Sequence, residues 1–137
     1  MVRFGNFEVE YNRNAPDKVS VRIETDDKGE VWLPKCDIAR AYGVFVQSVN
    51  AGLKSLAKTG DFDEYRDVRV EHFTYNGKYC SVDLYSLATI IALGFRMKGL
   101  KCEAFRKWAA RRLAESFEKK KNTVILCMSG EKRNSWN

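Results

Sequence analysis

The stretch KCDIARAYGVFVQSVNAGLK, residues 35–54, contains the pattern that decides the expected fold. Ala39, Gly43 and Val49 follow one another at spacings of four and six residues. A small residue is needed where one helix closely approaches the next, and a glycine where a tight turn requires a left-handed backbone angle. The valine then packs into the angle between the two helices. These positions predict a helix-turn-helix over residues 35–57.

The outward face of the second helix carries polar and basic side chains that suit contact with DNA. Glutamine and asparagine pair bidentately with adenine edges in the major groove. We therefore expect Gln47, Asn50 and Lys54 to read bases. Lys58, farther along the same helix, is expected to contact phosphate. The alternative is that this face is simply solvated.

An apolar tip, Phe45 and Val46, stands at the start of the second helix. Phe45 occupies the position where a serine or threonine would usually cap the helix, so the usual N-cap is missing. The tip is therefore a candidate contact for another protein.

The flanking segments predict β-hairpins. Residues 19–23 alternate between apolar and polar side chains, which indicates a half-buried strand. After a turn at residues 26–29, residues 30–33 are expected to return as its partner, and residues 2–11 to form another short strand. Farther along, Asn76-Gly77 between two strand-like segments is a strong hairpin signal.

Two further helices complete the predicted core. Residues 85–95 are apolar on nearly all sides, which predicts a buried central helix. Residues 100–121 predict a long amphipathic helix that packs against it. In that interface Phe105, Trp108 and Leu113 are expected to lie buried against Leu87, Ile90 and Ile91.

These elements together predict one small α+β domain. A chain of 137 residues suits a single domain with its own core. We expect the domain to span residues 1–128, with a charged loop through residue 67 and a short strand at 123–126. Residues 129–137 are expected to form a polar tail.

Positive charge is concentrated towards the C-terminus. Residues 94–137 hold twelve Lys and Arg against four Glu, within a chain whose net charge is +6. Such asymmetry indicates a polyanionic partner. The expected phosphate contacts are Arg96, Lys98, Lys107 and Arg111. Two alternatives stay open: the charge serves solubility, or Arg96 and Arg106 make internal ion pairs.

Other function classes lack their usual residues. No stretch approaches the ~18 apolar residues of a membrane span, and the first residues lack the apolar core of a signal peptide, so we expect a cytoplasmic protein without a membrane partner. Neither a phosphate-binding loop nor a nucleophile motif is present, so we expect no enzyme and no catalytic residue.

Cysteine and histidine usage gives no metal motif. His72 is the only histidine, and the cysteines are too scattered to form closely spaced ligand pairs. We therefore expect no metal site and no cofactor, and thiols that are reduced and mostly buried. The four cysteines are Cys36, Cys80, Cys102 and Cys127.

Two parts of the sequence resemble the RhuM family. The upstream motifs are Val31-Trp32-Leu33, Asp37-Ile38-Ala39, Tyr42-Gly43-Val44 and Gln47-Ser48-Val49. The downstream motifs are Tyr75-Asn76-Gly77-Lys78-Tyr79, Tyr85-Ser86-Leu87, Ile90-Ile91-Ala92-Leu93-Gly94-Phe95-Arg96 and Phe105-Arg106-Lys107-Trp108-Ala109. They occur in the same order as in the family, from about residue 19 to residue 117.

RhuM-like proteins are similar to the BRO-N and KilA-N domains of phages and large DNA viruses. The resemblance implies a DNA-binding, regulatory module carried on mobile elements. Together with the residues above, it predicts a non-enzymatic chain that binds double-stranded DNA. The alternative is a protein-interaction or assembly module without direct DNA binding, and homodimer formation stays open.

Overall fold

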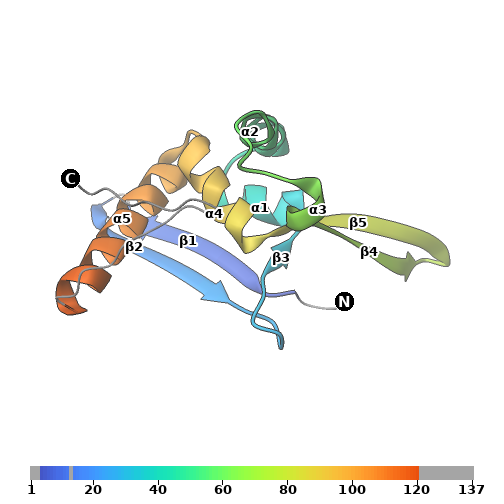
Figure 1. The fold of residues 1–137 in the computed structure, drawn as a ribbon, viewed down its shortest axis with the longest axis horizontal. Helices are drawn as coiled ribbons and strands as arrows, with labels where there is room; N and C mark the ends of the chain where they lie inside the picture. The colour runs from blue at the N-terminus through green and yellow to red at the C-terminus, as the bar shows by residue number, and fades with distance from the viewer. Residues whose placement is uncertain (1–3, 13, 121–137) are drawn as a thin grey trace, which may run out of the picture.

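Two antiparallel sheets and five helices make up the described residues, in a small single α+β domain (Figure 1). This computed structural model describes residues 4–12 and 14–120. The elements are β1 (Asn6–Asn12), β2 (Ala15–Glu24), β3 (Trp32–Leu33), α1 (Lys35–Tyr42), α2 (Val46–Lys58), α3 (Glu64–Asp67), β4 (Val68–Tyr75), β5 (Lys78–Ser86), α4 (Leu87–Arg96) and α5 (Leu100–Lys120). The expected fold class is confirmed, while the strand expected at 123–126 and the tail lie outside the described residues.

The pairing expected for residues 30–33 is wrong. β2 pairs with β1, whereas Trp32 and Leu33 pair with Ser86 and Tyr85 of β5 in a second sheet of order β3-β5-β4. The predicted turn at 26–29 does form, with the amide of Gly29 donating to the carbonyl of Asp26 at 3.0 Å. The chain leaving this turn passes on to the other sheet, and the Trp32 amide donates to the Phe4 carbonyl at 2.7 Å on the way.

The hairpin at Asn76-Gly77 is confirmed. Both turn residues have positive φ angles, 52° and 75°. Two consecutive left-handed residues match the right-handed twist of the flanking strands, which is why this dipeptide favours a two-residue hairpin. β4 and β5 stay paired from Val68–Tyr85 to Tyr75–Lys78.

An aromatic cluster forms the centre of the core. Phe105 of α5 contacts the rings of Phe7 in β1 and Tyr42 in α1, with ring centroids 5.7 and 5.6 Å apart. The Tyr42 hydroxyl donates to the Ile90 carbonyl of α4 at 2.7 Å. A Cβ at Gly94 would lie 2.6 Å from an atom of the Phe105 ring, so only glycine lets α4 approach this ring so closely.

Fewer side chains of the two C-terminal helices are buried than the sequence predicted. Phe105 is 1% exposed, but Trp108 is only partly buried and Leu113 is 56% exposed. At 21 residues α5 is about 30 Å long, twice the length of the ten-residue α4, so its far half extends beyond this partner. α4 begins two residues later than expected because Tyr85 and Ser86 belong to β5, and it buries one face rather than all sides.

The segment expected to be a charged loop contains the short helix α3 and a buried carboxylate. Asp67 is 3% exposed and accepts hydrogen bonds from the Arg66 guanidinium and the Ser86 hydroxyl, at 2.9 Å each, and from the Asp63 amide at 3.1 Å. Burial by itself would raise the pKa of Asp67, but these three donors outweigh it and hold that pKa below its ordinary value.

The cysteines are less buried than expected. Of the three that the structure describes, Cys102 is buried, Cys80 is partly buried and Cys36 is exposed. Cys127 lies outside the described residues. Burial raises the pKa of the Cys102 thiol, which keeps it protonated in the core.

We expect Phe105→Ala to lower the free energy of unfolding by about 3–5 kcal/mol, because the ring fills the centre of the core. Leu113→Ala on the same helix should change it by less than about 0.5 kcal/mol, because Leu113 is exposed. Urea unfolding of both variants measures the difference. Similar losses for the two would mean that α5 packs along its whole length.

We expect Asp67→Asn to destabilise the domain at neutral pH by about 1–3 kcal/mol. A lowered pKa means that the carboxylate stabilises the fold above the ordinary aspartate pKa of about 3.9, and that this contribution is lost as the pH falls through the folded-state pKa. Urea unfolding between pH 7 and pH 2.5 should show the two proteins converging in acid. Asp27→Asn, at an exposed turn residue, should follow the wild type throughout.

Candidate nucleic-acid interface

In the segment α1–turn–α2, the three residues that predicted a helix-turn-helix have the burial and the backbone conformation that this motif requires. Ala39 is 5% exposed and Val49 is fully buried. Gly43 ends α1 with a left-handed φ of 64°, and the Val44 amide donates to the Ala39 carbonyl at 2.9 Å. The three residues of the turn, 43–45, thus connect two packed helices in the way that the spacing predicted.

α4 packs against the buried face of α2. The buried face of α2 consists of Val49, Gly52, Leu53 and Leu56. A Cβ at Gly52 would lie 2.7 Å from a methyl carbon of Leu93, so α2 approaches α4 more closely than any other residue would allow. The opposite face of α2 is therefore turned away from the core.

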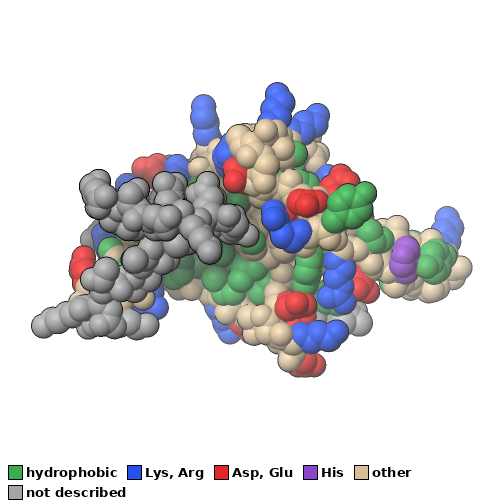
Figure 2. All heavy atoms as spheres, viewed as in Figure 1, with side chains coloured by type: hydrophobic (Ala, Val, Ile, Leu, Met, Phe, Trp, Pro, Cys, Tyr) green, Lys and Arg blue, Asp and Glu red, His purple; other side chains and the backbone are tan. Residues whose placement is uncertain are grey.

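That outer face carries the expected polar stripe in part. Gln47, Ala51, Lys54 and Lys58 are all exposed, and their spacing places them along one side of the helix. In Figure 1, α2 lies at the edge of the molecule. Figure 2 shows basic side chains projecting from the same edge, above α2 and the turn between α4 and α5.

Asn50 differs from its expected exposure. The residue is partly buried, and its carboxamide oxygen is enclosed without a hydrogen-bond partner among the described residues. A bidentate contact with adenine needs both carboxamide atoms to be accessible. In this conformation the exposed carboxamide on this face of α2 is that of Gln47, and not that of Asn50.

Arg96 connects the end of α4 to the end of α2. Its guanidinium donates to the Ser55 hydroxyl at 2.7 Å, the Thr59 hydroxyl at 3.0 Å and the Asp61 carboxylate at 3.1 Å. The internal ion pair considered for Arg96 is therefore present. Arg106 is also engaged internally, donating to the carbonyls of Gly94 and Met97 at 3.1 and 3.0 Å.

The turn between α4 and α5 lies beside the turn of the helix-turn-helix. Gly99 is next to Val44, and the side chain of Lys101 passes within 3.4 Å of the position that a Cβ on Gly43 would take. Lys98, in the same turn, is exposed. The sequence prediction omitted Lys101, because its closeness to Gly43 is a long-range contact that spacing does not reveal.

The remaining basic residues predicted as phosphate contacts lie along α5. Lys107 and Arg111 are exposed, and Lys107 forms an ion pair with Glu103 at 3.2 Å. α5 runs away from α2 along its length (Figure 1).

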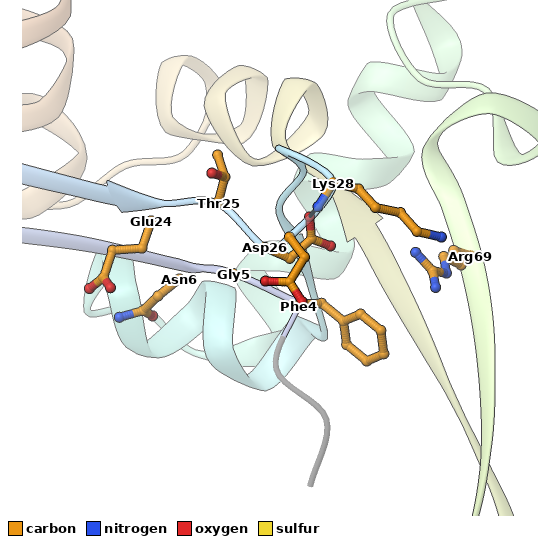
Figure 3. A pocket seen from close by; sticks show the side chains of 9 residues that line it. Phe4, Gly5, Asn6, Glu24, Thr25, Asp26, Lys28 and Arg69 are labelled. Carbon is orange, nitrogen blue, oxygen red and sulfur yellow. Dashed lines mark hydrogen bonds between the residues drawn. The ribbon is translucent and has the colours of Figure 1, made fainter.

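One hollow of the described structure lies beside the turn at residues 26–29. It measures about 580 Å³ and lies between the two sheets (Figure 3). Arg69 stands on one side with its guanidinium over the Phe4 ring, 5.0 Å from the centroid. Asp26 accepts from the amides of Lys28 and Glu30, which stabilises the turn.

Neither metal ligation nor a membrane span is supported in the part of the chain that the structure describes. Residues 4–12 and 14–120 contain no group of three His, Cys, Asp or Glu side chains placed to hold a metal ion. Within the same residues, no helix combines the length and apolar character needed to cross a bilayer. His72 is exposed and stacks on Tyr79, with ring centroids 5.4 Å apart.

Comparisons of the chain with protein-family models, with curated proteins and with solved structures give no match.

We expect Arg96 and Asp61 to be energetically coupled. A double-mutant cycle of Arg96→Ala and Asp61→Asn, followed by urea unfolding, should give a coupling energy of about 0.5–1 kcal/mol that shrinks in 1 M NaCl, because both side chains are partly exposed, at 33% and 54%. The more exposed pair Lys107–Glu103 is the control and should give about 0.5 kcal/mol or less. Additive effects of the Arg96 and Asp61 changes would show that the ion pair does not hold the guanidinium in place.

Proposed function

We propose that this chain is a non-enzymatic module that binds double-stranded DNA by placing α2 in the major groove. One observation carries the proposal: α2 is held by α1 and α4 so that Gln47, Lys54 and Lys58 form an exposed stripe at the edge of the molecule. The major groove of B-DNA admits an α-helix, and amide side chains read its adenine edges. The stripe contains no acidic side chain that would repel phosphate.

The residues have different proposed roles. Gln47 and Lys54 read bases, and Asn50 joins them only if its carboxamide turns outward. Lys58, Lys98 and Lys101 contact phosphates on either side of the groove. Lys107 and Arg111 extend the positive surface along α5.

Arg96 is assigned a different role from the one first expected. Its guanidinium is occupied by α2 and Asp61, so it serves to position α2. This arrangement supports sequence readout indirectly, because a recognition helix must be held at a fixed angle to the rest of the domain.

The resemblance to the RhuM family favours the same function. It implies a regulatory role on a mobile element, which is part of this proposal. The cytoplasmic location expected from the sequence is also part of it. Double-stranded DNA is the proposed partner, and no cofactor is required.

A second candidate function is a protein-interaction module. Phe45 is 81% exposed and Val46 is 38% exposed, at the N-terminal end of α2. Exposed aromatic side chains of this kind are common at protein interfaces. Because the tip adjoins the proposed reading face, one surface would serve either partner.

We expect Gln47→Ala to weaken binding to a preferred site by about 1–3 kcal/mol while leaving binding to random duplexes unchanged. Lys58→Ala should weaken both alike and reduce the salt slope by roughly 1, since phosphate contacts release counterions but carry no sequence information. Selection from random DNA followed by electrophoretic shift at several salt concentrations measures both effects.

Lys28→Ala is the matched control. Lys28 is exposed on the turn between β2 and β3, on the opposite side of the molecule from α2 (Figure 1). Failure of the wild-type chain to shift any duplex at low salt would contradict DNA binding. If Phe45→Ser then abolished self-association or partner binding, the interaction module would be the better function.

A further inference from the structure

The β4–β5 hairpin projects from the core as an arm, and its strand β4 lies at the edge of the sheet (Figure 1). The strand order is β3-β5-β4, so β4 has a neighbouring strand on one side only. From Val70 to Asp83 every residue of the arm is exposed or only partly buried. The outer edge of β4 is therefore a surface that another strand could join.

Alternate residues of β4 direct their backbone groups towards this free edge. The two-residue turn makes Tyr75 and Lys78 a hydrogen-bonded pair, and such pairs recur at every second residue of an antiparallel ladder. The odd-numbered residues of β4 therefore bond to β5. Val68, Val70 and His72 direct their amides and carbonyls outward.

The edge lacks the features that usually prevent a strand from pairing with another chain. Natural edge strands carry proline, lysine or a β-bulge for this purpose. β4 contains neither proline nor lysine, and its register with β5 is continuous from Val68 to Tyr75. The side chain of Val70 is 49% exposed. Neither sequence nor geometry protects this edge.

The charges of β4 favour a second copy of the same strand as its partner. Arg69 and Glu71 are the only Lys, Arg, Asp or Glu residues of β4, and they lie on one face of it. If two copies pair antiparallel about Val70, Arg69 of each copy stands opposite Glu71 of the other. Sliding the register by two residues in either direction sets Arg69 opposite Arg69 or Glu71 opposite Glu71. Opposite charges in a cross-strand pair are stabilising and like charges are destabilising, so one register is selected.

The outer edge of β5 offers no such match. Its charged residues Lys78 and Asp83 are an odd number of positions apart, so they lie on opposite faces of the strand. Antiparallel pairing of β5 with its own copy cannot set them opposite each other. β3 also covers this edge at Tyr85 and Ser86.

The internal ion pair leaves Arg69 and Glu71 able to make the cross-strand contact. Arg69 donates through Nε to one oxygen of Glu71 at 2.9 Å, and the two side chains are 34% and 31% exposed. Among the described residues, neither side chain makes another hydrogen bond. The guanidinium also lies over the Phe4 ring, a contact with the ring face that leaves its other N–H groups free.

We propose that a second copy of this chain pairs with this edge, so that two β4 strands run antiparallel across a two-fold axis at Val70. The Val70 amide donates to the partner's Val70 carbonyl and the His72 amide to the partner's Val68 carbonyl, and the axis repeats each bond. The Val68 amide, which donates to the Glu64 carbonyl of α3, is not needed. Adding a strand to an exposed sheet edge is a common mode of association. The inference goes beyond the proposed function and does not depend on DNA.

Exposed aromatic side chains extend the contact beyond the paired residues 68–72. In this register the tip of each arm runs past the partner's Val68 towards its α3, where Tyr65 is fully exposed. Phe73 and Tyr75, near that tip, are 45% and 66% exposed. The interface is small, and interfaces that bury less than about 1,200 Å² are typical of weak complexes. The dimer is therefore expected to dissociate on dilution.

The test is sedimentation equilibrium of the full chain without DNA, over a range of roughly 5–500 µM that suits a weak complex. The wild type should show a monomer–dimer equilibrium. Glu71→Arg and Arg69→Glu should each weaken the dimer roughly tenfold or more, because the axis repeats each cross-strand pair and both pairs become repulsive. The double variant Arg69→Glu/Glu71→Arg should restore it.

Mixing the two single variants separates the contact between copies from the internal ion pair. Neither variant retains the internal Arg69–Glu71 pair, yet in a mixed dimer opposite charges again face each other across the axis. The equimolar mixture should therefore associate roughly tenfold or more tightly than either variant by itself.

Val70→Lys provides a variant that keeps the internal ion pair. It places two ammonium groups at the axis and should also weaken the dimer, and circular dichroism checks that each variant is folded. If a charge variant does not fold, Val70→Lys decides. The matched control is Glu118→Arg, at an exposed residue of α5, which lies at the opposite end of the molecule from the arm (Figure 1). It should dimerise like the wild type.

The inference is overturned if the wild type stays monomeric over the whole range, or if Val70→Lys and Glu71→Arg dimerise as the wild type does. It is also overturned if the mixed variants do not associate, or if the mass rises past that of a dimer, because a two-fold contact is closed. These outcomes are independent of DNA binding, so the proposed function can fail while the dimer remains, and the reverse.

Discussion

The burial of the Phe105 ring is the interaction on which the other features depend. It brings β1, α1, α4 and α5 into contact at one point, since Phe7, Tyr42 and Phe95 all lie against it. Tyr42 is the last residue of α1, directly before the turn into α2. The direction in which α2 leaves the core is therefore determined by a ring that lies more than fifty residues farther along the chain.

A second set of contacts then fixes the rotation of α2 about its own axis. Leu93 and Met97 lie against Gly52 in the middle of the helix, and Arg96 holds its C-terminal end. Apolar contacts have no preferred direction, so by themselves they would allow α2 to rotate about its axis. The Arg96 guanidinium fixes one rotation of α2, because it donates hydrogen bonds to three acceptors. The outer stripe faces outward as a result of both contacts.

Sequence reasoning succeeded where the determining chemistry is local. Gly43 ends α1, and Asn76-Gly77 turns the hairpin, because the φ angles that these residues allow are properties of single residues. The three helix-turn-helix positions were predicted from one twenty-residue stretch. The exposed stripe on α2 followed from helical periodicity, apart from Asn50.

The failures at residues 30–33, Leu113 and Arg96 concern contacts between distant segments. Residues 30–33 looked like the partner of the preceding strand, but their partner, β5, lies about fifty residues away. Leu113 has the right spacing for burial, yet it is 56% exposed, because α4 does not extend along the far half of α5. Arg96 belonged to a basic cluster in the sequence, and only the fold reveals that Asp61 lies beside it.

The glycines at the back of α2 and in α4 have a consequence for how the domain folds. A glycine inside a helix lowers helical stability by about 1 kcal/mol relative to alanine, and helices of 13 and ten residues are marginal by themselves in water. α2 also lacks a side-chain hydrogen bond at its N-cap. Neither helix is expected to persist without the other, so the exposed stripe exists only while the whole domain is cooperatively folded. An excised peptide of α2 would therefore be largely unstructured. The exposed stripe would form and be lost together with the whole fold, in one cooperative folding transition.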